Sequence, residues 1–254
     1  MFTKAFAMEL NATGARRGLI VDTIECSRVD GPGDRFVVLL QGCTFNCLVC
    51  HNPETIPRRV LADSRWIDVD ELLGEIRVAA PTVSGITVSG GEATCQWPFV
   101  AELLRGVKSD AELAHLSCFV DTNGDAAEHV WDALGPWMDQ AMVDLKAFDP
   151  DVHQFLTGRG NERVLNTIPL LAARGQLYEV RLLLVPGVND DDAQLLRTAD
   201  WLHQAAPGVP VRVVPFRQGG TRAVAAVLPE MDADQLRRAA ATLSLAGITE
   251  VFAA

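Results

Sequence analysis

Three cysteines, Cys43, Cys47 and Cys50, are the residues of this chain whose type and spacing best suit chemistry. They follow an apolar run, residues 36–41, that is typical of a buried strand. Three thiolates on one short loop can hold three irons of a 4Fe-4S cluster, whereas four cysteines would leave the cluster closed. No fourth cysteine follows at ligand spacing. The remaining iron would be open to a ligand from outside the protein, which suits catalysis better than electron storage.

Zinc is the alternative for this loop. A site of three cysteines and one histidine would use His51, but His51 and Cys50 are neighbours, so both would have to ligate one ion from adjacent positions. Structural zinc sites usually take a second ligand pair from further along the chain, and none is visible. A disulfide is disfavoured because nothing in the sequence indicates secretion. The scattered Cys26, Cys95 and Cys118 are expected to be small buried residues.

A second candidate segment is Ser89, Gly90, Gly91 and Glu92, which ends another predicted strand. Paired glycines let a backbone approach a ligand where any Cβ would clash. The Glu92 carboxylate could accept hydrogen bonds from a ligand amino group. Alone, the Gly-Gly-Glu sequence is a weak signal and is more often a turn.

Acidic side chains end two further predicted strands. Asp121 closes one, and Asp144 closes the next, two residues before Lys146. Taken singly, Asp121 could be a helix cap or an Asx turn. Together, carboxylate and carbonyl oxygens at neighbouring strand ends could hold a small, monovalent cation or the ribose of a nucleoside.

The elements that must position these residues alternate along the chain. Strands are predicted at residues 36–41, 86–89, 117–121, 141–145, 179–185 and 211–215, with an edge strand at 23–26. Helices are predicted at 69–78, 98–108, 126–134, 164–174, 191–205 and 232–245. Six strand-then-helix units imply a parallel sheet flanked by helices, and in α/β barrels the active site is built from the loops at the carboxyl ends of the strands.

Composition narrows the class of protein further. The 254 residues are 48% hydrophobic and 22% charged, a size and balance compatible with one α/β barrel domain. The formal net charge of −11 argues against nucleic acid as a partner, since phosphate contacts need a basic surface. No apolar run approaches the length of a membrane span, and residues 1–20 do not read as a signal peptide. We therefore expect a cytoplasmic chain without a membrane partner.

The motifs together resemble one known family. Residues 29–35, 41–43 and 50–53, with the Gly-Gly-Glu segment one strand later, are similar to the activating enzymes of glycyl radical enzymes, which belong to the radical S-adenosylmethionine (SAM) superfamily. Further matches cover most of the chain: residues 89–93, 121–124, 144–146, 153, 156–158 and 185–187. Residues 84–94, 115–118, 156–161 and 171–174 favour the YjjW-type branch of these activases.

The resemblance implies a fold, a reaction and a site. The fold is a single α/β domain over residues 1–254, a partial (β/α)6 TIM-like radical SAM barrel, with an N-terminal extension over about residues 1–17 and a cluster loop at 42–52. The reaction is the reductive cleavage of SAM by a radical SAM oxidoreductase, followed by removal of a hydrogen atom from a backbone glycine of a partner glycyl radical enzyme. A flavodoxin or ferredoxin would supply the electron. One 4Fe-4S cluster would be held by the three motif cysteines, and SAM would lie against Asn52, Ser89, Gly90, Gly91, Glu92, Asp121, Thr122, Met142, Asp144, Lys146 and Arg217.

Two departures from the family pattern stand out. The YjjW-type branch usually carries a ferredoxin-like insert with extra cysteines after the cluster loop, whereas only residues 51–64 separate Cys50 from Arg65 here and none is cysteine. One cluster is therefore expected. After the sixth predicted strand many relatives place a histidine beside SAM, and this chain has Arg217.

Two rival interpretations remain. A radical SAM enzyme could act on a small molecule or on another peptide, and the missing insert keeps this possibility open. A non-catalytic iron-sulfur or zinc module would have no need of residues 90–92, Asp121 or Asp144.

Overall fold

The computed structural model describes residues 16–253, so the predicted N-terminal extension lies almost wholly outside the described residues. The described chain forms two compact units. Unit 1 comprises the described part of residues 1–44 together with 54–122 and 127–140, and unit 2 comprises 45–53, 123–126 and the described part of 141–254. The assignment of one radical SAM domain over residues 1–254 stays a prediction.

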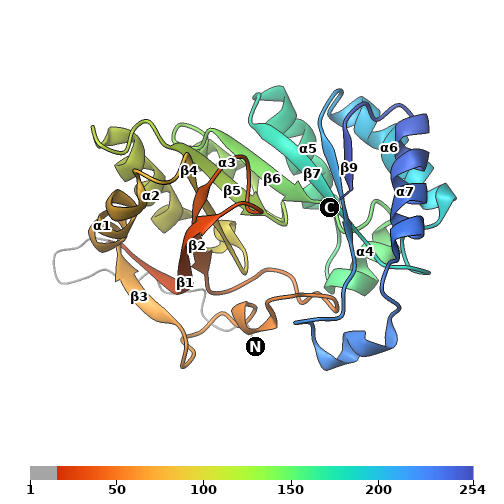
Figure 1. The fold of residues 1–254 in the computed structure, drawn as a ribbon, viewed down its shortest axis with the longest axis horizontal. Coiled ribbons are helices and arrows are strands. Elements are labelled where there is room, and N and C mark those ends of the chain that lie inside the picture. Colours follow the sequence, from red (N-terminus) through yellow and green to blue (C-terminus); the bar gives the residue numbers. More distant parts are fainter. Residues whose placement is uncertain (1–15, 254) are drawn as a thin grey trace. The chain divides into compact units, whose positions relative to one another are not determined.

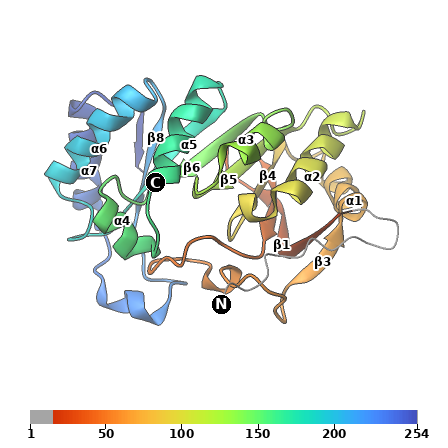
Figure 2. The ribbon, with the colours of Figure 1, turned by 180° about the vertical axis from the view of Figure 1, so that it is seen from behind.

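Unit 1 is a five-stranded sheet with helices packed against it. The strands are ordered β3-β1-β2-β4-β5, with β1 antiparallel to its two neighbours and β2, β4 and β5 mutually parallel. Helices α1 and α2 lie side by side in both views (Figures 1 and 2). The elements are β1 (Arg17–Ser27), β2 (Arg35–Leu40), the 3-10 turn η1 (Pro53–Thr55), β3 (Arg65–Asp68), α1 (Val69–Ala79), β4 (Gly85–Gly90), η2 (Ala93–Gln96), α2 (Trp97–Ser109), β5 (Ser117–Thr122) and α3 (Glu128–Leu134).

Unit 2 continues the alternation of strand and helix. Its strands β6, β7, β8 and β9 are parallel neighbours in that order. Helices α6 and α7 pack against each other, and α7 also contacts β9 (Figure 1). The elements are β6 (Gln140–Asp144), α4 (Pro150–Thr157), α5 (Glu162–Ala173), β7 (Leu177–Leu184), α6 (Asp192–Ala205), β8 (Val211–Pro215), η3 (Ala223–Val227), α7 (Ala233–Leu245) and β9 (Val251–Ala253).

The predicted strands and helices are confirmed within about two residues at most ends, and so is the α/β class with its parallel strand-helix units. The strand predicted at 23–26 is the second half of β1, which begins at Arg17. Strand β1 pairs with β3 from Arg17 to Ile20. From Thr23 onward its partner is β2, on the other side, so this half of β1 is an edge of the sheet. Sequence reasoning missed β3, β9 and α4. Among residues 16–253 no helix is long and apolar enough to cross a membrane.

The short helix α4 follows from local signals that the sequence analysis passed over. Pro150 occupies its first turn, where a missing N–H costs nothing, and the Asp149 carboxylate accepts the N–H groups of Asp151 and Val152 at 3.1 and 3.2 Å. Gly158, with φ of +76°, ends the helix. Its eight residues were too few to show a clear apolar period.

A buried arginine stabilises the parallel part of unit 1. Arg35, in the segment that resembles the activase family, is wholly buried and donates to the Thr87 hydroxyl at 3.1 Å and the Ser117 hydroxyl at 2.6 Å. Its guanidinium carbon also lies 4.5 Å from the centre of the Phe119 ring. Arg35 thus joins β2, β4 and β5 on the face that carries Ser89 and Asp121 at the opposite strand ends.

A buried glutamine fixes the point where β2 ends and the cysteine loop begins. The Gln96 side chain accepts the Leu19 N–H at 2.8 Å and donates to the carbonyls of Leu19 and Gln41, at 2.8 and 2.9 Å. Leu19 lies in β1 and Gln41 directly follows β2, so the Gln96 side chain joins β1 to the end of β2. Gln96 is 7% exposed, so water could not readily replace the hydrogen bonds that its side chain makes.

We predict that Gln96→Met lowers the free energy of unfolding by about 2 to 4 kcal/mol, because it leaves the buried Leu19 N–H and Gln41 carbonyl without this partner. Urea denaturation followed by circular dichroism measures the change. Gln154→Met, on the exposed side of α4, is the control and should stay within about 0.5 kcal/mol of the wild type. Equal stability of the two variants would contradict the role given to Gln96.

Candidate functional site

Main-chain hydrogen bonds hold the first residues of the cysteine loop in unit 1. The Gly42 N–H donates to the Thr55 carbonyl at 2.6 Å, and the Cys43 N–H donates to the Ile56 carbonyl at 3.1 Å. The Arg58 side chain in turn donates to the Cys43 carbonyl at 2.9 Å. The residues that follow the loop therefore hold both sides of the Cys43 backbone.

The paired glycines lie against this same segment. The Gly91 N–H donates to the Leu40 carbonyl at 2.8 Å, and the Glu92 N–H donates to the Gly42 carbonyl at 2.9 Å. A Cβ at Gly91 would lie 2.5 Å from the Gly42 oxygen, and one at Gly90, where φ is +110°, would lie 2.2 Å from the Leu40 nitrogen. In the structure, glycine is thus required at both positions by the backbone of β2 and the loop. The predicted approach of a ligand at these glycines would be an additional reason.

Glu92 ties the ends of β4 and β5 together. Its side chain is 1% exposed, and one carboxylate oxygen, Oε1, accepts the Thr122 hydroxyl at 2.8 Å, the Thr94 hydroxyl at 2.7 Å and the Thr94 N–H at 2.9 Å. Thr122, predicted as a neighbour of the nucleoside, is buried in this network. A contact between Glu92 and the methionine amino group of SAM stays a prediction.

Ser89 and Asp121 are brought together across the same two strands. The Ser89 hydroxyl donates to the Asp121 carboxylate at 2.8 Å. Asp121 lies inside β5 and therefore caps no helix, which removes that alternative. Both side chains are partly exposed at the carboxyl ends of parallel strands, the edge at which α/β proteins bind ligands.

In unit 2, helix α4 anchors the second half of the cysteine loop. The N–H groups of Asn46 and Leu48 donate to the carbonyls of Thr157 and Leu156, both at 2.9 Å. These carbonyls are available because a helix leaves its last four carbonyls without a helical partner. Residues 156–158, which resemble the activase family, thus end α4, and the carbonyls of Leu156 and Thr157 bind the loop.

An apolar cluster supports the same part of the loop. Val49 is 3% exposed and packs with Leu156 of α4, Leu183 of β7, Phe216 after β8 and Ala225 of η3, and Leu48 packs against this cluster. Phe45, at the start of the segment, meets the His153 ring edge-on at 5.3 Å between ring centres. Burial lowers the pKa of His153, so its ring is a neutral packing partner that donates from Nδ1 to the Arg159 carbonyl at 2.9 Å.

Asp144 and Lys146 form an ion pair after β6. The Lys146 ammonium lies 2.7 Å from the Asp144 carboxylate, with both side chains largely shielded from solvent. Both charges influence the pKa of the Cys47 thiol. Burial raises this pKa to about 11, the nearby Lys146 ammonium lowers it, and Cys50 and Asp144 raise it further. Cys47 is therefore a protonated thiol in the chain without metal, and binding a metal ion would have to displace that proton.

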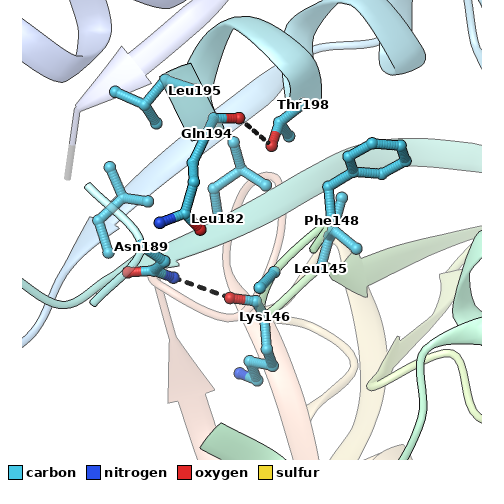
Figure 3. A pocket seen from close by; sticks show the side chains of 10 residues that line it. Leu145, Lys146, Phe148, Leu182, Asn189, Gln194, Leu195 and Thr198 are labelled. Atoms are coloured by element: carbon cyan, nitrogen blue, oxygen red, sulfur yellow. Dashed lines mark hydrogen bonds between the residues drawn. The ribbon is translucent and has the colours of Figure 1, made fainter. Parts of the chain in front are cut away.

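Asn189 fixes the backbone of Lys146. Its side-chain amide donates to the carbonyls of Lys146 and Leu183, both at 2.8 Å, and its oxygen accepts the Val185 N–H at 2.7 Å. Figure 3 shows Asn189 reaching Lys146 beside a small, mainly apolar pocket beneath α6, while the ammonium of Lys146 points away from that pocket. The pocket is lined by Leu145, Lys146, Ala147, Phe148, Leu182, Leu184, Asn189, Gln194, Leu195 and Thr198. Sequence analysis missed Asn189, although it follows the matched residues 185–187.

A group of charges that the sequence analysis also missed shares a sheet face with Met142 and Asp144. Met142 is wholly buried, and its sulfur lies 2.8 Å from a guanidinium nitrogen of Arg181. Glu179, 2% exposed, accepts from Arg181 at 2.7 Å and from Arg212 at 3.0 Å. The register sets Met142 opposite Glu179 and Asp144 opposite Arg181. The sequence signal that could have revealed this group is the presence of Glu179 and Arg181 in the otherwise apolar strand β7.

Arg217 lies close to the cysteine loop through its backbone. Its carbonyl accepts the His51 Nε2–H at 3.0 Å, and its guanidinium donates to the Met231 carbonyl. Asn52, one residue further along the loop, is exposed. The proposed contacts of Asn52 and Arg217 with SAM stay predictions.

The three motif cysteines are distributed over the two units, Cys43 in unit 1 and Cys47 and Cys50 in unit 2. Within residues 16–253 no group of three or more His, Cys, Asp or Glu side chains is arranged as a metal site, so the cluster ligands stay a prediction from spacing. None of the three forms a disulfide. Three thiols on one loop are the soft donors that iron-sulfur clusters take, and they fit the expected cluster chemically.

Among the other cysteines, Cys118 is buried as expected, Cys95 is partly buried, and Cys26 is exposed, so the prediction for Cys26 was wrong.

Comparisons with known proteins agree with the expected family. The model of the radical SAM superfamily matches residues 37–199. Pyruvate formate-lyase-activating enzymes of Staphylococcus epidermidis and Staphylococcus aureus are 33% and 34% identical over 200 residues, which is 76% of this chain and 78% of each relative.

Solved structures share the fold. A domain of the pyruvate-formate lyase-activating enzyme from Bacteroides vulgatus has a TM-score of 0.56 at 22% identity, covering 67% of this chain and 99% of that domain. A radical SAM methyltransferase from Sphaerobacter thermophilus has a TM-score of 0.66 at 19% identity, covering 97% and 75% of the two chains. These likenesses, with the parallel strand-helix units, confirm the predicted radical SAM barrel class.

We predict that Gly91→Ala destabilises the protein by about 1 to 3 kcal/mol, because the added methyl group meets the backbone oxygens of Gly42 and Thr55. Gly74→Ala is the matched control: Gly74 lies inside α1 with nothing within 4 Å of an added Cβ, and the change should stabilise by about 0.5 to 1 kcal/mol. Urea denaturation compares the two. Shifts of the same sign would contradict the close backbone approach at Gly91.

Proposed function

Because the chain belongs to the radical SAM superfamily and, within it, to the family of pyruvate formate-lyase-activating enzymes, we propose that it generates a glycyl radical on a partner enzyme. When bound, the 4Fe-4S cluster supplies the electron that cleaves SAM reductively, and the deoxyadenosyl fragment takes a hydrogen atom from a backbone glycine of the partner. The observation that carries the proposal is the Cys-x3-Cys-x2-Cys loop in a chain about one third identical to activating enzymes over most of its length.

Each unit contributes its own proposed contacts with the cluster and with SAM. In unit 1, Cys43 would hold one iron, the Gly90–Gly91 backbone and Glu92 would bind the methionine end of SAM, and Asp121, supported by Ser89, would face the nucleoside. In unit 2, Cys47 and Cys50 would hold two further irons, and the fourth iron would have no protein ligand. Met142, the Asp144–Lys146 pair, Asn52 and Arg217 are also proposed to contact SAM.

Electrostatics give the Asp144–Lys146 pair a definite task in this proposal. A lysine ammonium is a hydrogen-bond donor with a positive charge, and the methionine carboxylate of SAM is an acceptor of matching charge. Asp144 would keep the ammonium oriented, and its second oxygen could accept a ribose hydroxyl or ligate a monovalent cation. Asn189 would hold the strand end from which Lys146 extends.

The reductant and the cellular setting belong to the same proposal. A flavodoxin or ferredoxin would deliver the electron, because the cluster needs a small carrier of low potential. The net charge of −11 supports the expectation that nucleic acid is not a partner. A cytoplasmic location without a membrane partner belongs to the same proposal.

A second function remains a specific alternative. The ferredoxin-like insert that is usual in the YjjW-type branch is missing here, because only residues 51–64 separate Cys50 from Arg65 and none of them is cysteine. Action on a small molecule or another peptide is therefore the outcome that the functional test must distinguish.

We predict that the anaerobic, reconstituted protein, supplied with SAM, reduced flavodoxin and a candidate glycyl radical enzyme from the same organism, produces a glycine-centred radical detectable by electron paramagnetic resonance. With α-deuterated glycine in the partner, deuterium should appear in 5'-deoxyadenosine. The partner with its radical-bearing glycine changed to alanine is the control. Cleavage of SAM without a radical or deuterium transfer in any glycyl radical enzyme of that organism would favour the small-molecule alternative.

A further inference from the structure

Arg222, between β8 and η3, binds the backbone of the cysteine loop from 175 residues away in the sequence. One guanidinium nitrogen donates to the carbonyls of Asn46 and Cys47, both at 3.1 Å, and the other donates to the Asn46 side-chain oxygen at 2.7 Å. A planar guanidinium with fixed donor directions is suited to this arrangement, whereas a lysine ammonium would offer a single point charge. All these residues belong to unit 2.

The contacts fix both peptide groups that flank Cys47. The peptide before Cys47 is held through the Asn46 carbonyl, which Arg222 binds. The peptide after Cys47 is held on one side by Arg222 at the Cys47 carbonyl and on the other by the Leu48 N–H, which donates to the Leu156 carbonyl of α4. With both peptide planes fixed, the φ and ψ angles of Cys47 are fixed, and so is the direction of its Cα–Cβ bond.

Arg222 is itself firmly placed. It precedes η3, whose Ala225 is wholly buried in the apolar cluster that also contains Val49 of the loop. The Arg222 N-terminal neighbour Thr221 donates its N–H and its hydroxyl to the Gln218 carbonyl, which closes the turn before η3. The Arg222 guanidinium therefore extends from a well-supported backbone and forms its hydrogen bonds to the cysteine loop from there.

We propose that Arg222 is a positioning residue that aims the Cys47 sulfur and places a positive charge beside the iron-sulfur ligand loop. The inference rests on the proposed function for the assignment of Cys47 as an iron ligand. A merely structural role, in which Arg222 ties η3 to the loop, would affect stability without affecting how iron is held.

Hydrogen exchange tests the positioning in the protein without metal. In Arg222→Gln, a peptide covering residues 45–49 should exchange about tenfold faster or more, because the N–H groups of Asn46 and Leu48 lose the order that Arg222 provides. Arg238→Gln, an exposed position on α7, is the control and should leave that peptide unchanged. Unchanged exchange of residues 45–49 in Arg222→Gln would overturn the proposal.

The loaded protein then tests the link to iron. Arg222→Gln should release iron to a chelator several-fold faster than the wild type and should shift the midpoint potential of the cluster to a more negative value, since a positive charge favours the reduced state. Arg222→Lys keeps the charge and loses the planar fork, so it should retain the potential and still release iron faster. Faster exchange of the loop with unchanged iron release and potential would assign Arg222 to a structural tie and overturn the proposal. If the wild type takes up no iron, the proposed function fails, while the exchange experiment still decides whether Arg222 orders the loop.

Discussion

The close approach of two stretches of backbone is the constraint on which the unit 1 part of the site depends. Gly90 and Gly91 lie so near to Leu40 and Gly42 that neither can carry a side chain without moving the main chain. This approach sets the hydrogen bonds that hold the first residues of the cysteine loop. It also places Glu92 directly after the glycines, where the side chain is buried and joined to Thr122 at the end of β5. The packing requirement and the proposed contacts with SAM thus involve the same residues.

Unit 2 holds its part of the loop in a different way. Helix α4 offers two carbonyls, Arg222 offers a guanidinium, and Val49 enters an apolar cluster. The Asp144–Lys146 pair lies close enough to Cys47 to influence the pKa of its thiol. The predicted ligands Cys47 and Cys50, a charged pair and a supporting helix therefore lie together within one unit.

The fold was largely predictable because its parallel strands are continuous apolar runs and its helices show clear amphipathic patterns. Elements with little such signal were missed: β3 and β9 have four and three residues, and α4 has eight. In the candidate site, the spacing of Asp144 and Lys146 indicated their proximity, and the two form an ion pair. The cluster ligands of the cysteine loop stay a prediction from spacing. Asn189, Arg222 and Glu179 could not be placed, because their roles depend on contacts between residues far apart in the sequence.

The most direct test of the central claim measures iron content and SAM cleavage together. The wild-type protein, reconstituted anaerobically, should contain about four irons per chain and, with SAM and dithionite, should release methionine and 5'-deoxyadenosine. Cys47→Ala should retain the fold, since a chain of this size buries enough apolar surface unaided, and should produce no 5'-deoxyadenosine. Stoichiometric zinc in the freshly isolated protein, an iron count near that of three clusters, or normal 5'-deoxyadenosine formation by Cys47→Ala would contradict the account.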